Sequence, residues 1–237
     1  MRGLLVTATD TGVGKTILSA ALLAAMSAAG ERVSAHKPVV TGLDDRSEVG
    51  RPGGWPPDHE LLAAIAKMTG EDVAPLRYGP AVSPHLAAQL AGERIDPAGL
   101  VARAQAAGAH AASGEETSLI VEGVGGLLAP LAEDYTVRDF AVALGLPLLI
   151  AARPGLGTIN HTLLTLGGAR AAGLNVRAVV LTPWPEQPSE LERSNRETIA
   201  RMGKINVVGL DNVPSPNPAD LARAGAALPW RNWLEEI

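Results

Sequence analysis

The sequence has no cysteine and few aromatic residues: its 237 residues include one Phe, two Tyr and four Trp. Without cysteine the chain can form no disulfide bond, no thiolate metal site and no cysteine nucleophile. The few aromatic rings offer no platform on which bases could stack, and a net charge of −5 argues against the basic surface that nucleic-acid binding requires. We therefore expect no nucleic-acid partner.

Long hydrophobic runs are also missing. The longest, residues 140–152, is interrupted by Gly145 and Pro147, whereas a membrane-spanning helix needs about 20 apolar residues. The apolar stretch before Asp10 is too short for the core of a signal peptide. We expect a soluble, cytoplasmic protein without a membrane partner.

Short apolar runs alternate with helical patterns along the chain. The runs lack a polar–apolar alternation, which is typical of buried parallel strands; they cover residues 3–7, 32–36, 118–121, 147–151, 178–181 and 206–208. Helices are predicted for residues 16–29 and 60–67 and after the capping signals Ser83-Pro84, Asp96-Pro97 and Thr136 with Asp139. Residues 42–57 and 182–188 are predicted loops. The pattern predicts an α/β fold, a mostly parallel sheet with helices on both faces, in one domain over residues 1–237.

The strongest motif lies between the first predicted strand and helix. It reads Ala-Thr-Asp-Thr-Gly-Val-Gly-Lys-Thr over residues 8–16, a P-loop whose backbone N–H groups would surround phosphates. Lys15 would reach the β- and γ-phosphates of ATP, and the Thr16 hydroxyl would bind Mg²⁺. The leading glycine of the standard pattern is absent, because Ala8 and Thr9 occupy the two places where it could stand.

Two further charged residues end predicted strands. Lys37, followed by Pro38, ends the second strand and could stabilise charge on a transferred phosphoryl group; a solvated lysine at a strand end is the alternative. Glu122, followed by the glycine-rich residues 123–126, stands where many P-loop enzymes carry a Mg²⁺ ligand. A surface or helix-capping glutamate is the alternative there.

Two other segments allow more than one interpretation. Asp58 precedes a predicted helix and is either a second Mg²⁺ ligand or an N-cap. Residues 155–161 begin a helix whose free N–H groups could hold a substrate carboxylate, or they form a tight turn with Thr158 as the cap. The five histidines show no metal-ligand spacing, and a structural role is expected for His85 and His161.

Together these motifs resemble those of the dethiobiotin synthetase family. The resemblance rests on residues 6–16, 37–42, 83–85, 121–126 and 157–165, which follow the family's order and approximate spacing. It implies a P-loop NTPase fold and an ATP- and Mg²⁺-dependent reaction of 7,8-diaminononanoate with CO₂ or bicarbonate. It also implies a homodimer whose active sites are shared between subunits.

The resemblance assigns a role to each matching residue. Lys37 and Lys15 would be catalytic, and Thr16, Asp58 and Glu122 would be associated with Mg²⁺. The remaining nucleotide-binding positions would be Gly12, Val13, Gly14, Ile17, Gly123, Val124, Gly125, Thr182, Pro183, Val213, Pro214 and Ser215. Besides Lys37, the substrate-binding positions would be Thr11, Thr41, Thr158, Ile159 and Asn160, the last three reached from the partner subunit.

The C-terminal third departs from the family pattern. Thr182-Pro183 stands where well-known members carry an asparagine that reads adenine, so the preference for ATP over other nucleotides stays open, and Asp220 is a weak further candidate. A partitioning-type regulatory ATPase is the alternative function, but Asp10 occupies the place of its signature lysine. The chain also lacks room for the glutaminase domain of a cobalamin-pathway amidotransferase. A degenerate P-loop used only for binding would not need Lys15, Thr16, Lys37 and Glu122 together.

Overall fold

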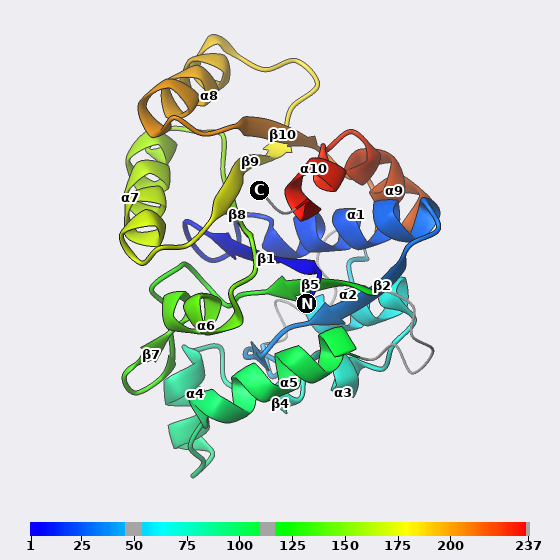
Figure 1. The fold of residues 1–237 in the computed structure, drawn as a ribbon, viewed down its shortest axis with the longest axis vertical. Helices are drawn as coiled ribbons and strands as arrows, with labels where there is room; N and C mark the ends of the chain where they lie inside the picture. The colour runs from blue at the N-terminus through cyan, green and yellow to red at the C-terminus, as the bar shows by residue number, and fades with distance from the viewer. Residues whose placement is uncertain (46–53, 110–116, 236–237) are drawn as a thin grey trace.

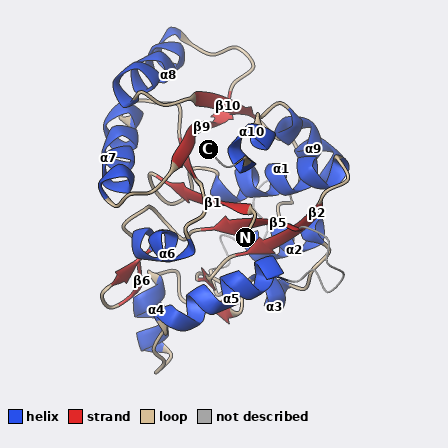
Figure 2. Ribbon diagram, in the orientation of Figure 1, coloured by secondary structure: helices blue, strands red, loops and turns tan. Residues whose placement is uncertain are grey.

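The central feature of the fold is a parallel sheet. In a computed structural model, which describes residues 1–45, 54–109 and 117–235, six strands form this sheet in the order β10-β9-β8-β1-β5-β2. All neighbouring pairs are parallel, and the helices lie on both sides of the sheet (Figure 1, Figure 2). The α/β architecture expected from the sequence is confirmed.

The elements have the following bounds. The sheet strands are β1 (Gly3–Ala8), β2 (Arg32–His36), β5 (Thr117–Glu122), β8 (Leu148–Ala152), β9 (Val176–Trp184) and β10 (Val207–Asp211). Two small strand pairs join β3 (Val39–Val40) to β4 (Leu76–Arg77) and β6 (Pro130–Ala132) to β7 (Tyr135–Thr136). The helices are α1 (Lys15–Ala28), α2 (Asp58–Ala66), α3 (Gly70–Val73), α4 (Pro84–Leu90), α5 (Pro97–Ala109), α6 (Val137–Leu144), α7 (Thr158–Ala171), α8 (Glu190–Gly203), α9 (Pro218–Ala226) and α10 (Trp230–Leu234).

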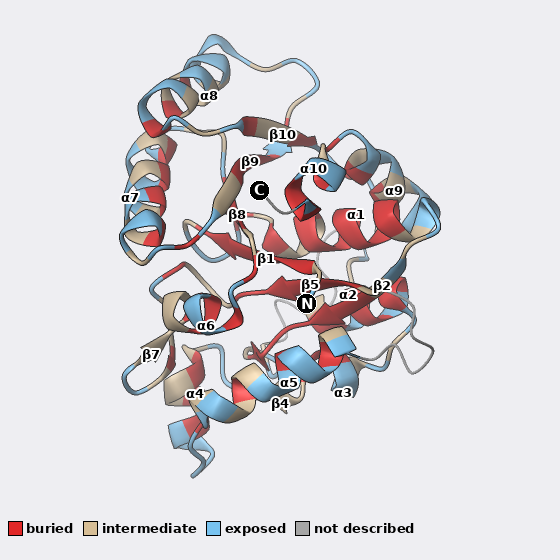
Figure 3. Cartoon of the chain, viewed as in Figure 1, coloured by how far each residue is buried: buried red, intermediate tan, exposed pale blue. Residues whose placement is uncertain are grey.

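The strands β1, β5 and β8 in the middle of the sheet are buried on both faces, which explains their continuous apolar sequences. Leu4, Val6 and Ala8 of β1 pack in one core cluster with α1, α2, α9 and α10. Leu5 points to the opposite face and packs in the cluster formed with α4 to α8. Figure 3 shows the buried strands between these two helical layers. The carboxyl ends of the parallel strands therefore meet at one edge, where ligands bind in such sheets.

The prediction of a loop at residues 182–188 is wrong for residues 182–184, which belong to β9. β9 continues to Trp184 because the ladder with β10 resumes on the far side of Pro183, pairing Trp184 with Asp211 after a register shift. The Thr182–Pro183 peptide bond is cis. Of the other predicted loop, residues 46–53 lie outside the described residues.

The predicted helix of residues 16–29 is α1, shifted by one residue, and the capping box at Thr136 is present with Asp139. None of the helices in the described ranges has the length and apolar character needed to span a membrane.

Candidate active site

The P-loop connects β1 to α1 through two glycines with positive φ. Gly12 has φ 68° and Gly14 has φ 97°, values that other residues adopt only with strain. Neither Ala8 nor Thr9 has a positive φ; Ala8 is the last residue of β1, and the Thr9 N–H donates to the Ala151 carbonyl at 3.0 Å. The missing leading glycine therefore costs this backbone no strain. The side chains of Val13 and Ile17 pack into the core. Their backbone groups are therefore the parts of these residues that face the phosphate-binding side of the loop.

The first turn of α1 is suited to bind an anion. Gly14 is the N-cap residue, and no side chain caps the N–H groups of this turn, which leaves them available to phosphate oxygens. Lys15 is buried, and its ammonium donates to the Asp10 carbonyl at 3.0 Å. Burial lowers the pKa of Lys15 to about 8, although Glu122 acts in the opposite direction. A bound phosphate would raise the pKa of Lys15 by supplying a close negative partner.

Lys37 joins two carboxylates beside the P-loop. Its Nζ lies 2.5 Å from Glu122 Oε1 and 2.7 Å from Asp58 Oδ2. The Thr16 hydroxyl donates to the same Glu122 Oε1 at 2.9 Å. Lys37, directly after β2, thus meets residues of α1, α2 and β5 in one cluster at the carboxyl edge of the sheet.

The burial of Lys37 and Glu122 and the position of Asp58 exclude their interpretation as surface or helix-capping residues. Lys37 and Glu122 are buried, with exposed side-chain fractions of 6% and 0%, so neither is a surface residue. Asp58 is not an N-cap, because Pro57 occupies that position and Asp58 is the first helical residue. Burial by itself would lower the pKa of Lys37, but Asp58 and Glu122 outweigh that effect and raise it. Lys37 is therefore a cation at neutral pH.

The glycines after Glu122 lie against the P-loop. A Cβ at Gly126 would stand 3.4 Å from the carbonyl oxygens of Ala8 and Thr9. The Gly123 N–H donates to the Val6 carbonyl at 2.9 Å, and a Cβ at Gly125 would lie 3.6 Å from Thr11 Oγ1. The resemblance assigns Gly123 and Gly125 to the nucleotide site; in this structure Gly125 and Gly126 lie close to P-loop atoms. Val124 packs against the core on the other side.

Thr182 supports the P-loop from β9. Its side chain is buried, and a Cβ at Gly14 would stand only 2.8 Å from Thr182 Cγ2. Gly14 is therefore constrained twice, by its positive φ and by the space that Thr182 leaves.

We expect Gly14→Ala to destabilise the protein by more than the backbone strain of about 1–2 kcal/mol that a left-handed position imposes, and to weaken nucleotide binding. Gly145→Ala is the matched control, because Gly145 has φ 65° and nothing within 4 Å of its Cβ position. Thermal unfolding would measure both variants, and adding Thr182→Ser to Gly14→Ala should restore part of the loss. Equal destabilisation by the two single changes would contradict the steric role of Thr182.

On the side predicted for substrate, the start of α7 differs from expectation. Gly157, with φ 88°, is the N-cap residue, and no side chain caps this helix. The interpretation of Thr158 as the cap is wrong: Thr158 is already helical, and its hydroxyl lies 3.3 Å from that of Thr162. Ile159 is half-buried and Asn160 is exposed.

Two residues that the sequence did not identify hold this region together. Arg153, just after β8, donates to the carbonyls of Thr11 and Gly12 at 3.4 and 3.2 Å. Asn195 of α8 is buried and donates to the carbonyls of Pro154 and Gly155. They connect the P-loop to the segment before α7. A lone arginine after a strand and a polar residue inside a helix give no sequence signal of such contacts.

The remaining predicted site residues follow β3 and β10 in the chain. Thr41 follows β3 and is half-buried, and no hydrogen bond within the described part of the chain joins it to the P-loop. Val213 is a core residue after β10. Ser215 donates to Asp220 Oδ2 at 2.7 Å, so Asp220 shapes the loop that carries Pro214.

The oxygen atoms near Lys37 form a set that would fit Mg²⁺. This ion prefers oxygen ligands and is commonly held by one or two carboxylates together with substrate phosphates and water. Thr16 Oγ1 and Glu122 lie in contact, and Glu122 Oε2 is buried with no hydrogen-bond partner among the described residues. Those residues contain no group of three or more His, Cys, Asp or Glu that could hold a metal ion.

The fold and the loop define the class of protein. A mostly parallel sheet with a P-loop between β1 and α1 is the arrangement of a P-loop NTPase, and a family model described as an AAA domain matches residues 2–217. Among solved structures, the MinC:MinD cell division protein complex of Aquifex aeolicus has a TM-score of 0.52 at 14% identity, covering 95% of this chain and 86% of that chain. The signal recognition particle receptor FtsY of Elizabethkingia anophelis also has a TM-score of 0.52, at 12% identity, covering 95% and 65%. At such identities the likeness concerns the fold alone.

Curated relatives define the family more closely. The ATP-dependent dethiobiotin synthetase of Mycobacterium sp. (strain KMS) is 39% identical over 99% of this chain and 98% of its own. The protein of that name from Anoxybacillus flavithermus is 34% identical over 88% and 90%. The chain belongs to the dethiobiotin synthetase family.

Proposed function

We propose that the chain converts 7,8-diaminononanoate, CO₂ and ATP to dethiobiotin, ADP and phosphate. The observation that carries the proposal is the Lys37 ammonium between Glu122 and Asp58 beside a P-loop, in a chain whose relatives are named ATP-dependent dethiobiotin synthetases. A regulatory ATPase of the partitioning type is not favoured by these relatives, and Asp10 stands where its signature lysine would be.

The proposed reaction has three steps. One substrate amine adds to CO₂ and loses a proton, which gives a carbamate. A carbamate oxygen then attacks the γ-phosphorus of ATP and ADP leaves, which forms a carbamic–phosphoric anhydride. The second amine attacks the anhydride carbon, loses a proton and expels phosphate, which closes the cyclic urea. Such a reaction depends mainly on holding the reactants in line and on stabilising charge.

The nucleotide is held chiefly by the backbone of residues 12–17. Their N–H groups and Lys15 would bind the β- and γ-phosphates, while Lys37 would face the carbamate and the transferred phosphoryl group. Mg²⁺ held by Thr16, Glu122 and Asp58 would neutralise charge on the phosphate oxygens when bound. Residues 123–125, Thr182-Pro183 and Val213–Pro214–Ser215 would complete the nucleotide site. Thr11 and Thr41 would contact the diamine.

We also propose a homodimer of one-domain, cytoplasmic subunits with shared sites. α10 packs in the same core cluster as α1, which supports one domain over residues 1–237. Several apolar side chains near α6 and α7 are exposed: Leu128, Val142, Leu156 and Leu164, with Leu156 exposed at 91%. Exposed apolar groups of this kind are typical of protein interfaces. In a dimer through this face, Thr158, Ile159 and Asn160 would hold the substrate carboxylate of the partner subunit.

Leu164→Glu tests the dimer. A charge at a buried interface is costly to desolvate, so we expect this change to shift the protein toward monomers and to lower turnover. Met202→Glu, a comparably exposed position on α8, is the control. Sedimentation equilibrium would measure the oligomeric state of both variants, and a Leu164→Glu protein that sediments like the unaltered chain would contradict this interface.

The function itself is tested by phosphate release from ATP and Mg²⁺, with and without the diamine and bicarbonate. We expect release to require both compounds and to yield dethiobiotin in equal amounts. Release that is indifferent to the diamine would overturn the proposal and favour a regulatory ATPase. Repeating the assay with other nucleoside triphosphates would define the base preference that Thr182-Pro183 leaves open.

A further inference from the structure

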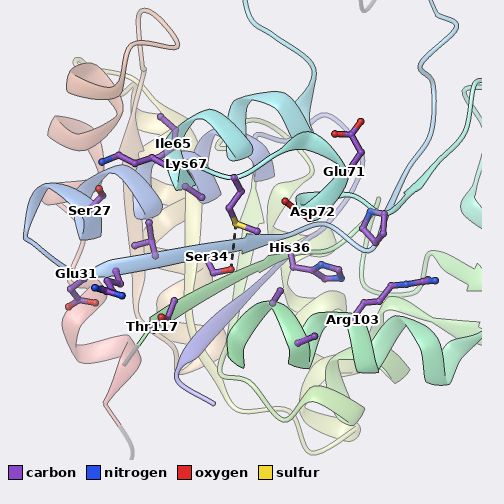
Figure 4. Close-up of a pocket in the computed structure, with 17 residues that line it drawn as sticks. Ser27, Glu31, Ser34, His36, Ile65, Lys67, Glu71, Asp72, Arg103 and Thr117 are labelled. Atoms are coloured by element: carbon purple, nitrogen blue, oxygen red, sulfur yellow. Dashed lines mark hydrogen bonds between the residues drawn. The ribbon is translucent and has the colours of Figure 1, made fainter. Parts of the chain in front are cut away.

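A second cavity lies at the β2 edge of the sheet, away from the P-loop. Its volume is about 640 Å³, within the range of about 300–1,000 Å³ that is typical of small-ligand sites. Side chains from β2, α1, α2, α3 and α5 line it, as Figure 4 shows. No P-loop residue contributes to it; its nearest link to the cluster described above is His36, which directly precedes Lys37.

His36 is the unusual member of the lining. The residue is only 1% exposed, yet neither ring nitrogen has a hydrogen-bond partner among the described residues. Buried polar atoms are normally paired, because burying them unpaired costs free energy. Burial, together with the nearby charge of Arg103, lowers the pKa of His36 to about 4. At neutral pH the ring is therefore uncharged and offers one donor and one acceptor.

The cavity lining carries three acidic residues, Glu31, Glu71 and Asp72, and three basic residues, Arg32, Lys67 and Arg103. Its acidic residues already have partners: Glu31 bonds to Arg2 and Ser118, Glu71 to Arg77, and Asp72 to Thr69. Arg103 of α5 is exposed, and within the described ranges no hydrogen bond or ion pair of its guanidinium is found. Figure 4 shows Arg103 and the His36 ring on the same side of β2. A guanidinium of this kind is suited to a carboxylate.

The rest of the lining mixes apolar and polar side chains. Val33 and Ile65 pack on the face of β2 that is covered by α1 and α2. Ala107 of α5 packs on the opposite face, which is also the face of Ser34 and His36, because alternate residues of a strand share a face. The Met68 sulfur lies 3.6 Å from Ser34 Oγ. Methionine adapts its shape to different apolar neighbours. An aliphatic chain of several carbons would therefore find apolar contacts next to the polar end formed by His36 and Arg103.

We propose that this cavity is a second ligand site, which binds a small aliphatic carboxylate with its carboxylate at Arg103 and His36 and its chain along Met68 and Ala107. The proposal does not depend on the proposed reaction, because it rests on the cavity and its lining alone. The ligand would contact His36, which directly precedes Lys37 in the chain.

The four methionines of the chain allow a site-specific test in the absence of nucleotide. The protein would be labelled with ¹³C-methyl methionine, the Met68 signal would be assigned with Met68→Leu, and octanoate would be added as the probe. We expect a saturable shift of the Met68 signal, while Met202 on the distant helix α8 (Figure 1) stays unchanged. A Met68 signal that does not respond would overturn the proposal.

Two variants establish where and how octanoate binds. Arg103→Gln and His36→Phe should each weaken binding at least about tenfold, the effect of losing about 1.4 kcal/mol of interaction, whereas Arg201→Gln on α8 should have no effect. His36→Phe should unfold at an unchanged or higher temperature, since it removes unpaired buried nitrogens. Binding that survives both variants, or an equal response to octanol, would show that the carboxylate is not recognised and would overturn the proposal.

Discussion

Lys37→Met should reduce turnover by about 10²–10³, the loss expected when a group that stabilises transition-state charge is removed. Methionine keeps most of the length of the lysine stem but cannot donate to the carbamate or to the phosphoryl group. ATP binding, measured separately by calorimetry, should be retained, because the backbone of the P-loop is untouched. Steady-state turnover with saturating diamine, bicarbonate and ATP is the measurement.

The control for Lys37→Met must separate chemistry from folding. Glu122 is fully buried and pairs with Lys37, and removing one partner of a buried pair costs about 3–5 kcal/mol. The pKa of Lys37 is raised above the ordinary lysine pKa of 10.5. The stability that the Lys37–Glu122 pair contributes is therefore fully present below pH 10.5 and is lost only at higher pH. Thermal unfolding near pH 7 should therefore show the loss, whereas Lys204→Asn, at an exposed position with φ 45°, should change neither property. Normal turnover of Lys37→Met would remove Lys37 from the reaction.

Glu122→Gln should raise the Mg²⁺ concentration needed for half-maximal activity by at least about tenfold, since even residues that only orient metal ligands change metal affinity by about 10–100-fold. Glutamine keeps the shape of the side chain and removes its charge. Lys37 retains Asp58 as a partner at 2.7 Å, so we expect the variant to fold. The measurement is a Mg²⁺ titration of phosphate release.

Glu197→Gln provides the comparison for Glu122→Gln, because Glu197 is an exposed carboxylate on α8. Its magnesium curve should superimpose on that of the unaltered protein. A Glu122→Gln curve of normal midpoint would place the metal elsewhere, whatever the change in maximal rate.

The sequence predicts those parts of the site that depend on local patterns. Lys15 and Thr16 follow from the P-loop motif, and Lys37 and Glu122 follow from their positions at the ends of buried strands, because parallel strands end at one edge. Asp58 could not be decided in this way. Whether it caps α2 or points to Lys37 depends on where α2 packs, and that packing, which is against α1 and β2, joins residues far apart in the chain.

The features that the sequence does not predict depend on contacts between distant segments. The Thr182 methyl group stands over Gly14 only because β9 extends beyond the predicted strand end, a consequence of its pairing with β10. Threonine is a residue type that often caps helices, so the sequence favours Thr158 as the cap. In the structure Gly157 adopts a left-handed conformation and is the N-cap residue, and the helix begins at Thr158. Arg153 reaches the P-loop because β8 lies beside β1. None of these has a periodic or compositional signal.

The edge strand β2 has a further consequence for assembly. Unpaired backbone groups on an edge strand can recruit a strand from another molecule and so start aggregation. Here the Ala35 N–H points to the Met68 sulfur at 3.4 Å, and the Lys37 N–H donates to the Val73 carbonyl at 2.8 Å. The chain after α2 therefore occupies the positions where a foreign strand would pair. Self-association through this edge is therefore discouraged.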